Sequence, residues 1–156
     1  MIEIIPYESK YQPDFKRLNL EWLDKYHLTE SHDLEILDNP EEKVIAGGGC
    51  IFLAKDGERI IGNAGIARVN DEVFELVKMA VETAYRGQGI SKTLLELCIA
   101  EARKANAKKI ILFSNSQLTT ALKLYQKSGF RHVEVVGTPL LTADVKMELD
   151  LMQALS

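Results

Sequence analysis

The chain has 156 residues, of which 46% are hydrophobic and 27% are charged, values close to those of ordinary globular proteins. This composition excludes a disordered chain, and the length predicts one domain over residues 1–156. The net charge of −4 argues against a general nucleic-acid binder, because that affinity comes largely from neutralised phosphates, but it is compatible with amine substrates.

The cysteines and the N-terminus bear on the compartment. Cys50 and Cys98 lie in apolar stretches without a metal-binding or redox spacing, which predicts buried free thiols in a reducing compartment and no metal site. The N-terminal residues lack a basic segment followed by a long apolar run, and no apolar run approaches the ~20 residues that span a bilayer. We therefore expect a cytoplasmic protein without a membrane partner.

The first half of the chain predicts a strand, two helices and a meander of three strands. A short strand over residues 2–5 ends at Pro6, and apolar residues at helical spacing predict a helix over residues 12–26. A shorter, more acidic helix is predicted over residues 31–37. Turn signals at Asp56-Gly57 and Asn70-Asp71 separate three further predicted strands, over residues 50–54, 59–69 and 73–81.

The second half predicts a helix, a strand, a second helix and two final strands. A wide apolar stripe marks the first helix, at Ile90, Leu94, Leu95, Cys98, Ile99 and Ala102. Residues 109–113 predict a buried strand, and the next helix has one apolar face, formed by Leu118, Ala121, Leu122 and Tyr125. Gly129 suits the position after this helix, since only Gly enters the left-handed region at little cost. Residues 130–136 and 145–151 are predicted strands, paired around a turn at Gly137-Thr138-Pro139, which completes an α+β domain.

A glycine-containing loop joins the strand that ends near Val81 to the helix that begins near Gln88. It reads Arg86-Gly87-Gln88-Gly89-Ile90-Ser91. A helix start offers unpaired N–H groups and a partial positive charge, and residues without side chains let an anion approach them. The spacing fits neither the dinucleotide-binding pattern nor a P-loop. The alternative is that both glycines only shape the turn.

The motifs on either side of this loop resemble the GNAT superfamily of N-acetyltransferases. Its signature loop has Arg or Gln, then Gly three residues later and Gly or Ala after two more, and this chain has Arg86, Gly89 and Ser91 there. Ser91 departs from the pattern but is small. Residues 75–81 resemble the strand before the loop, and residues 121–130 match the family's A-x-x-L-Y-x-K-x-G-F run. The specific motifs cover residues 73–130.

The resemblance implies a fold and a binding mode. We expect a mixed, mostly antiparallel central sheet flanked by helices, whose central strands splay after Val81 and Phe113 to form a coenzyme A cleft. The pantetheine arm would bond the backbone of Met79 and Val81 like an added strand, and the pyrophosphate would lie on the N–H groups of residues 87–92. The implied cofactor-binding residues are Met79, Ala80, Val81, Arg86, Gly87, Gln88, Gly89, Ile90, Ser91, Lys92, Asn115 and Tyr125.

The implied activity is transfer of an acetyl group from acetyl-CoA directly to a primary amine, in a ternary complex. An amine of pKa ~10.4 is mostly protonated at pH 7, a handicap of about 4.6 kcal/mol that a base can partly offset, and the departing thiolate benefits from a proton donor. Glu75 matches the catalytic glutamate of the histone-acetyltransferase branch, and Tyr125 matches the tyrosine that donates to the coenzyme sulfur. The alternatives are a surface carboxylate and a core aromatic residue.

The connection between the first two helices lines the acceptor site in this family. The candidates to meet the acceptor are Trp22, Tyr26, Glu30, His32 and Asp33; the alternative is a solvated polar connection. A polyamine, an aminoglycoside, an amino acid, a peptide N-terminus and a protein lysine all remain open as acceptors, and the family resemblance allows a homodimer. Two other functions stay open: a non-catalytic acyl-CoA sensor and an unrelated nucleotide-binding module.

Overall fold

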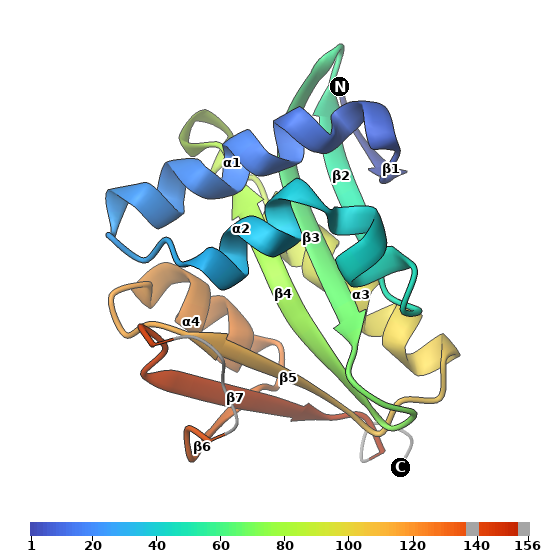
Figure 1. The fold of residues 1–156 in the computed structure, drawn as a ribbon, viewed down its shortest axis with the longest axis vertical. Coiled ribbons are helices and arrows are strands. Elements are labelled where there is room, and N and C mark those ends of the chain that lie inside the picture. The colour runs from blue at the N-terminus through green and yellow to red at the C-terminus, as the bar shows by residue number, and fades with distance from the viewer. Residues whose placement is uncertain (137–140, 153–156) are drawn as a thin grey trace.

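The computed structural model describes residues 1–136 and 141–152 and has a seven-stranded sheet in the order β1-β2-β3-β4-β5-β7-β6 (Figure 1). The strands are β1 (Ile2–Pro6), β2 (Cys50–Asp56), β3 (Arg59–Arg68), β4 (Val73–Val81), β5 (Lys109–Ser114), β6 (Arg131–Val133) and β7 (Val145–Asp150). Every neighbouring pair is antiparallel except β4–β5, which is parallel. The predicted α+β fold with a mostly antiparallel sheet is confirmed.

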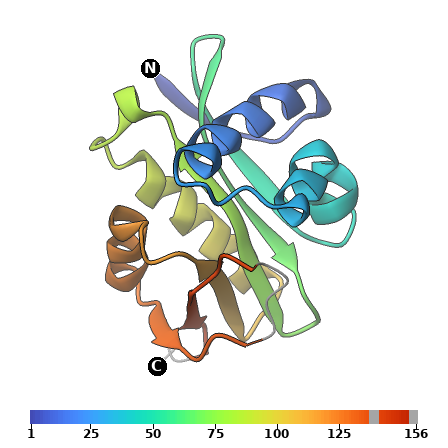
Figure 2. The same ribbon diagram turned by 60° about the vertical axis from the view of Figure 1, so that its left-hand side comes forward.

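Helices cover both faces of the sheet. They are α1 (Gln12–Lys25), α2 (Ser31–Asp38), α3 (Ile90–Lys104) and α4 (Thr119–Lys127), with short helical segments η1 (Ser9–Tyr11), η2 (Glu41–Ile45) and η3 (Thr83–Tyr85). Helices α1 and α2 lie on one face, and α3 and α4 lie on the other (Figures 1 and 2). None of the helices in residues 1–136 and 141–152 has the length and apolar character needed to cross a bilayer.

Each face of the sheet has its own hydrophobic core. The periodic positions of α1 are buried against the sheet, and Phe15 is fully buried there together with Leu37 of α2 and Leu53 of β2. On the opposite face Leu94 and Leu95 of α3 pack in a second core. A fully buried side chain of this size contributes about 1.5–3 kcal/mol, so the two cores fix the helices on which the cleft depends.

Several element boundaries differ from the predicted ones. The π-helical η2 follows α2 and was not predicted, because Asn39-Pro40 ends α2 but Pro40 also has the backbone angles that start a new helical turn. Strand β6 is only three residues long and lies at the edge of the sheet, and Val135 and Val136, expected in this strand, are exposed outside it. The turn expected at Gly137-Thr138-Pro139 lies outside the described residues.

The two parallel strands β4 and β5 separate earlier than the sequence predicted. They are paired only over Val73–Leu76 and Lys109–Leu112, so the splay begins there and not after Val81 and Phe113. At the same level β4 has a bulge: Leu76 pairs with Ile66 of β3, Lys78 pairs with the adjacent Gly65, and Val77 is the extra residue. A bulge bends its strand, and this one lies where β4 leaves β5.

Candidate active site

A cleft of about 400 Å³ lies where β4 and β5 separate. Its walls come from the separated strands, the C-terminal half of α1 and the following connection, the starts of α3 and α4, and the residues just before β7. Residues far apart in the sequence, such as Trp22, Lys78, Tyr125 and Thr142, therefore line one cavity.

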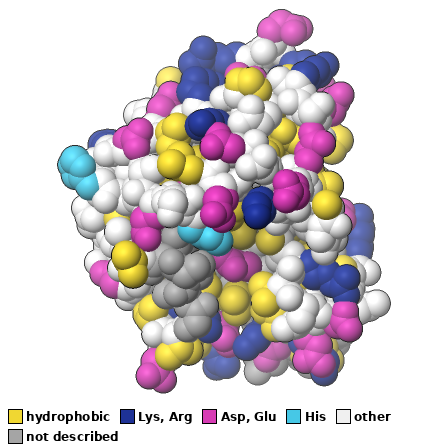
Figure 3. Space-filling view, in the orientation of Figure 1, with side chains coloured by type: hydrophobic (Ala, Val, Ile, Leu, Met, Phe, Trp, Pro, Cys, Tyr) yellow, Lys and Arg dark blue, Asp and Glu magenta, His cyan; other side chains and the backbone are white. Residues whose placement is uncertain are grey.

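On the face that carries α1 and α2, acidic and basic side chains are interspersed, with no large region of one sign (Figure 3).

The free edge of β4 forms one wall of the cleft. Met79, Ala80 and Val81 all line it, as expected for cofactor-binding residues. They pair with β3 on one side, but the register with β5 ends at Leu76, so no strand among the described residues pairs with them on the other side. An unpaired strand edge offers backbone donors and acceptors to an extended ligand. This edge therefore fits the amide-bearing arm expected of coenzyme A.

The glycine loop has the backbone conformation of an anion cradle. Gly87 and Gly89 have φ of 81° and 79°, and a Cβ on either would meet nothing within 4 Å. The left-handed backbone, and not crowding within the protein, therefore requires glycine at both positions. Gly89 caps α3, and no side-chain hydrogen bond satisfies the first N–H groups of that helix. These groups remain available to a phosphate.

Most of the loop residues expected to bind the cofactor line the cleft. They are Arg86, Gly87, Gly89, Ile90, Ser91 and Lys92. Gln88 does not line it and is exposed. The guanidinium of Arg86 also donates to the carbonyl of Val81 at 3.4 Å, which holds this cation beside the end of β4.

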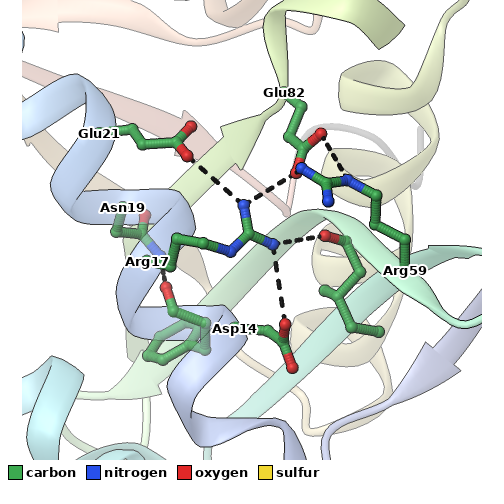
Figure 4. A network of polar contacts seen from close by, with 8 residues as sticks. Asp14, Arg17, Asn19, Glu21, Arg59 and Glu82 are labelled. Atoms are coloured by element: carbon green, nitrogen blue, oxygen red, sulfur yellow. Dashed lines mark hydrogen bonds and ion pairs between the residues drawn. The ribbon is translucent and has the colours of Figure 1, made fainter.

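Ion pairs fix the base of the loop to the rest of the fold. Glu82, whose side chain is 11% exposed, accepts hydrogen bonds from Arg17 of α1 at 2.8 Å and from Arg59 of β3 at 3.1 Å (Figure 4). Burial alone would raise the pKa of Glu82, but the bonds from the two guanidinium groups lower it overall. Three residues later the Tyr85 hydroxyl donates to Asp56 at 2.6 Å. The loop thus begins from a segment anchored to α1, β2 and β3.

Tyr125 is a residue of α4 that lines the cleft. It lines the cavity but is only 8% exposed, and its ring packs against Phe130 with centroids 5.8 Å apart. Burial, with a smaller effect from Cys98, raises the pKa of Tyr125 above its ordinary value of 10.0. The hydroxyl is therefore protonated at neutral pH and can act as a donor. Among the described residues, no side chain or backbone group accepts a hydrogen bond from the Tyr125 hydroxyl.

Asn115 lines the cleft, but its side chain is occupied by the protein. It donates to the carbonyl of Thr142 at 2.7 Å and accepts from the N–H of Gln117 at 3.0 Å. Its amide therefore joins the end of β5 to the residues before β7. This arrangement shapes the cleft wall and leaves little of the amide for a cofactor.

Glu75 lies just outside the cleft. It pairs with Ile111 in the last part of the sheet where β4 and β5 remain together, and its side chain is not among the cleft-lining groups. Burial raises the pKa of Glu75, while the charges of Lys78 and Lys146 oppose that rise. A raised pKa favours proton uptake near neutral pH, but from this position a water would have to connect the carboxylate to a ligand.

The five residues expected at the acceptor site divide into two groups. Trp22, Tyr26 and Asp33 line the cleft, whereas Glu30 and His32 do not. The Glu30 carboxylate accepts two backbone hydrogen bonds, from Leu141 and Thr142, both at 2.9 Å, and one from the Thr142 hydroxyl at 2.6 Å. These bonds lower the pKa of Glu30, the Thr142 hydroxyl contributing most. Glu30 therefore holds the α1–α2 connection against the residues before β7.

A buried ion pair in the cleft wall was not predicted. The Nζ of Lys78 lies 2.6 Å from Oδ1 of Asp33, and their side chains are only 5% and 3% exposed. A lysine inside the apolar run of a central strand is the signal that could have revealed it, because Lys is rarely buried without a partner. The backbone of Lys78 is also held, since its carbonyl accepts from the buried Asn63 at 3.5 Å, which in turn bonds to Asn19 of α1.

Comparison with known proteins agrees with this geometry. A sequence model described as the Acetyltransferase (GNAT) family matches residues 12–130. The chain is 36% identical over 91 residues to N-acetylaspartate synthetase from Xenopus tropicalis, which covers 57% of this chain and 33% of that protein. It spans about a third of the length of the N-acetylaspartate synthetases that it matches.

Solved structures share the whole fold. An acetyltransferase of the GNAT family from Staphylococcus aureus Mu50 aligns with a TM-score of 0.89 and 25% identity, over 97% of this chain and 99% of the other. A GNAT family acetyltransferase from Elizabethkingia anophelis with acetyl-CoA bound aligns with a TM-score of 0.68 and 24% identity, over 96% and 98%. The described cleft, the glycine loop and the matched residues lead to one conclusion: this chain belongs to the Acetyltransferase (GNAT) family.

Proposed function

We propose that this chain transfers the acetyl group of acetyl-CoA directly to a primary amine while both substrates are bound. The observation that supports this most is that one cavity contains the free edge of β4, the glycine loop and Tyr125 together with Trp22, Tyr26 and Asp33. Two ligands that meet in such a cavity can react without a covalent enzyme intermediate, because the site holds the reacting groups together.

The donor half of the cleft suits coenzyme A. The unpaired backbone of β4 matches an amide-bearing arm, and the left-handed glycines at the start of α3 match a pyrophosphate. Arg86 and Lys92 add positive charge beside that position. Coenzyme A supplies the acetyl group as a reactive thioester, so the protein has to orient it, remove a proton from the amine and protonate the sulfur.

The amine must lose a proton before it can react. At an amine pKa of ~10.4 this costs about 4.6 kcal/mol at pH 7. We assign Glu75 to this step, acting through a water, because burial raises the pKa of its carboxyl while Lys78 and Lys146 keep it ionisable. A base whose pKa lies nearer the working pH is the more effective one.

The proton donor to the sulfur is assigned to Tyr125. Its ring is fixed by packing against Phe130, and its raised pKa keeps the hydroxyl protonated. A hydroxyl held at the cleft wall can protonate a leaving thiolate without moving. One relative is named for the synthesis of N-acetylaspartate, an acetylated amine that carries carboxylates, which keeps amino acids among the proposed acceptors.

A mass-spectrometric screen tests the proposal. The protein is incubated with acetyl-CoA and a panel of polyamines, aminoglycosides, amino acids, peptides with free N-termini and lysine-containing peptides. We expect at least one amine to gain one acetyl group with release of an equal amount of free coenzyme A. Tight acetyl-CoA binding without transfer to any class would instead identify an acyl-CoA sensor.

A further inference from the structure

The ammonium group of Lys78 has unused hydrogen-bonding capacity at the cleft. It carries three N–H donors, and among the described residues Asp33 is its only hydrogen-bond partner. Its side chain is 5% exposed, and Lys78 is one of the residues that line the cleft, together with the apolar Leu23, Leu28 and Val77. A buried ammonium without enough partners is unfavourable, so the remaining donors favour an acceptor atom that enters from the cleft.

Two of the neighbouring acidic groups, Asp33 and Glu30, are by contrast already bonded within the protein, while Glu75 interacts with Lys78 through its charge and lies outside the cleft lining. Asp33 accepts from Lys78 with one oxygen and from the backbone N–H of Glu30 with the other. The carboxylate of Glu30 accepts three bonds from Leu141 and Thr142. At this side of the cleft the protein therefore offers donors to a ligand more readily than it offers carboxylate oxygens.

The position of Lys78 places those donors beside the reaction centre. Lys78 directly precedes Met79, the first of the three β4 residues that we expect to carry the donor arm. The ion pair with Asp33 and the bond from Asn63 to the Lys78 carbonyl hold both ends of the residue. A group bound by the ammonium would therefore lie close to the amine that reacts, as the carboxylate of an α-amino acid does.

We infer that Lys78, positioned by Asp33, binds a carboxylate of the acceptor, so that the acceptor is an amino acid and not a polyamine or aminoglycoside. This inference rests on the proposed acetyl transfer and specifies its substrate. Trp22, Leu23 and Leu28 in the same wall would accommodate the amino-acid side chain. Lys78 is a specificity-determining residue in this reaction: it selects the acceptor and neither donates nor accepts a transferred proton.

Matched acceptor pairs test the inference. Acetyl transfer to L-leucine, L-phenylalanine and L-aspartate is compared with transfer to the α-amide of each, and to the diamine putrescine. Each kcat/KM is calculated from the concentration of unprotonated amine, because an α-amide lowers the pKa of the neighbouring amine and so raises its unprotonated fraction. We expect the best carboxylate to exceed its amide by about 10- to 100-fold, the range of one hydrogen bond to a charged group.

Substitutions then link this preference to Lys78. Lys78→Met alone leaves Asp33 buried and unpaired, which can unfold the protein, so Lys78→Met/Asp33→Asn removes both charges together. In the double variant the ratio of carboxylate to amide should fall to about one. Lys146→Met is the control, because it removes a neighbouring cation that does not line the cleft, and it should keep the ratio. Circular dichroism and the thermal midpoint establish that each variant is folded.

The outcomes are separable. Efficient transfer to amides or putrescine, with no preference for the carboxylate, would overturn the role of Lys78 and leave the proposed acetyl transfer standing. A preference that persists in the folded double variant would do the same, since Lys78 would then only hold α2 on the sheet. If no amine in any class is acetylated, both proposals fail. If the variants do not fold, the ratio of carboxylate to amide kcat/KM in the unmodified protein decides whether the inference stands.

Discussion

Replacing Tyr125 with Phe tests the proton donor while disturbing the packing least. The ring would keep its contact with Phe130, and no hydrogen bond among the described residues is lost with the hydroxyl. The free energy of unfolding should therefore change by no more than about 1 kcal/mol. Chemistry should slow by roughly 10- to 10³-fold, which corresponds to about 1.4–4 kcal/mol of transition-state stabilisation.

The pH dependence adds a second readout. Because burial raises the pKa of Tyr125 above 10.0, fewer than about one molecule in 10³ is ionised at pH 7, and the unmodified enzyme should keep its proton donor throughout the neutral range. Single-turnover acetyl transfer is measured for Tyr125→Phe alongside its thermal midpoint. Tyr7→Phe serves as the control, since Tyr7 packs against Phe15 away from the cleft. Full-speed transfer by a folded Tyr125→Phe would refute the assignment and leave protonation of the sulfur to solvent.

Two further substitutions examine the base and the anion cradle. Glu75→Gln should lower kcat by about 10²–10⁴-fold at nearly unchanged acetyl-CoA affinity. Since burial raises the pKa of Glu75, the acidic limb of the pH–rate profile should lie above 4.5 and should shift in this variant; less than a threefold change on the true acceptor would exclude the role. Gly89→Asp should abolish acetyl-CoA binding in calorimetry with a near-native circular dichroism spectrum, because a carboxylate and a strained φ of 79° would replace the cradle; unchanged affinity would remove the loop from the site.

Local patterns predicted most elements of this fold. The apolar stripes of α1 and α3 are buried as their spacing indicated, and Gly129 has the positive φ expected after α4. The glycine loop was identified because its signal lies within a few consecutive residues. Local signals of this kind report on the backbone near them, whatever the rest of the chain does.

The missed features depend on partners that are distant in the sequence. The bulge at Val77 is defined by pairing with β3, and it lies where the strands separate, five residues closer to the start of β4 than the family pattern alone suggests. The Lys78–Asp33 pair joins residues 45 positions apart, and the bonds from Thr142 to Glu30 span 112 positions. No periodicity or spacing rule connects such residues, because their proximity is a product of the completed sheet and its packed helices.

The bulge at Val77 also changes which residues of β4 face which side of the sheet. The strand residues that pack in the core on the α3 side are Phe74, Leu76, Met79 and Val81, which change from even to odd positions across the bulge. Successive side chains of a strand point to opposite faces, so an uninterrupted alternation over these same residues would point Lys78 into the apolar core beneath α3. Because Val77 is an extra residue, Lys78 lies instead on the α2 side, where Asp33 pairs with it. The presence of one extra residue, more than the identity of that residue, therefore decides whether the Lys78 ammonium meets the cleft wall or the core.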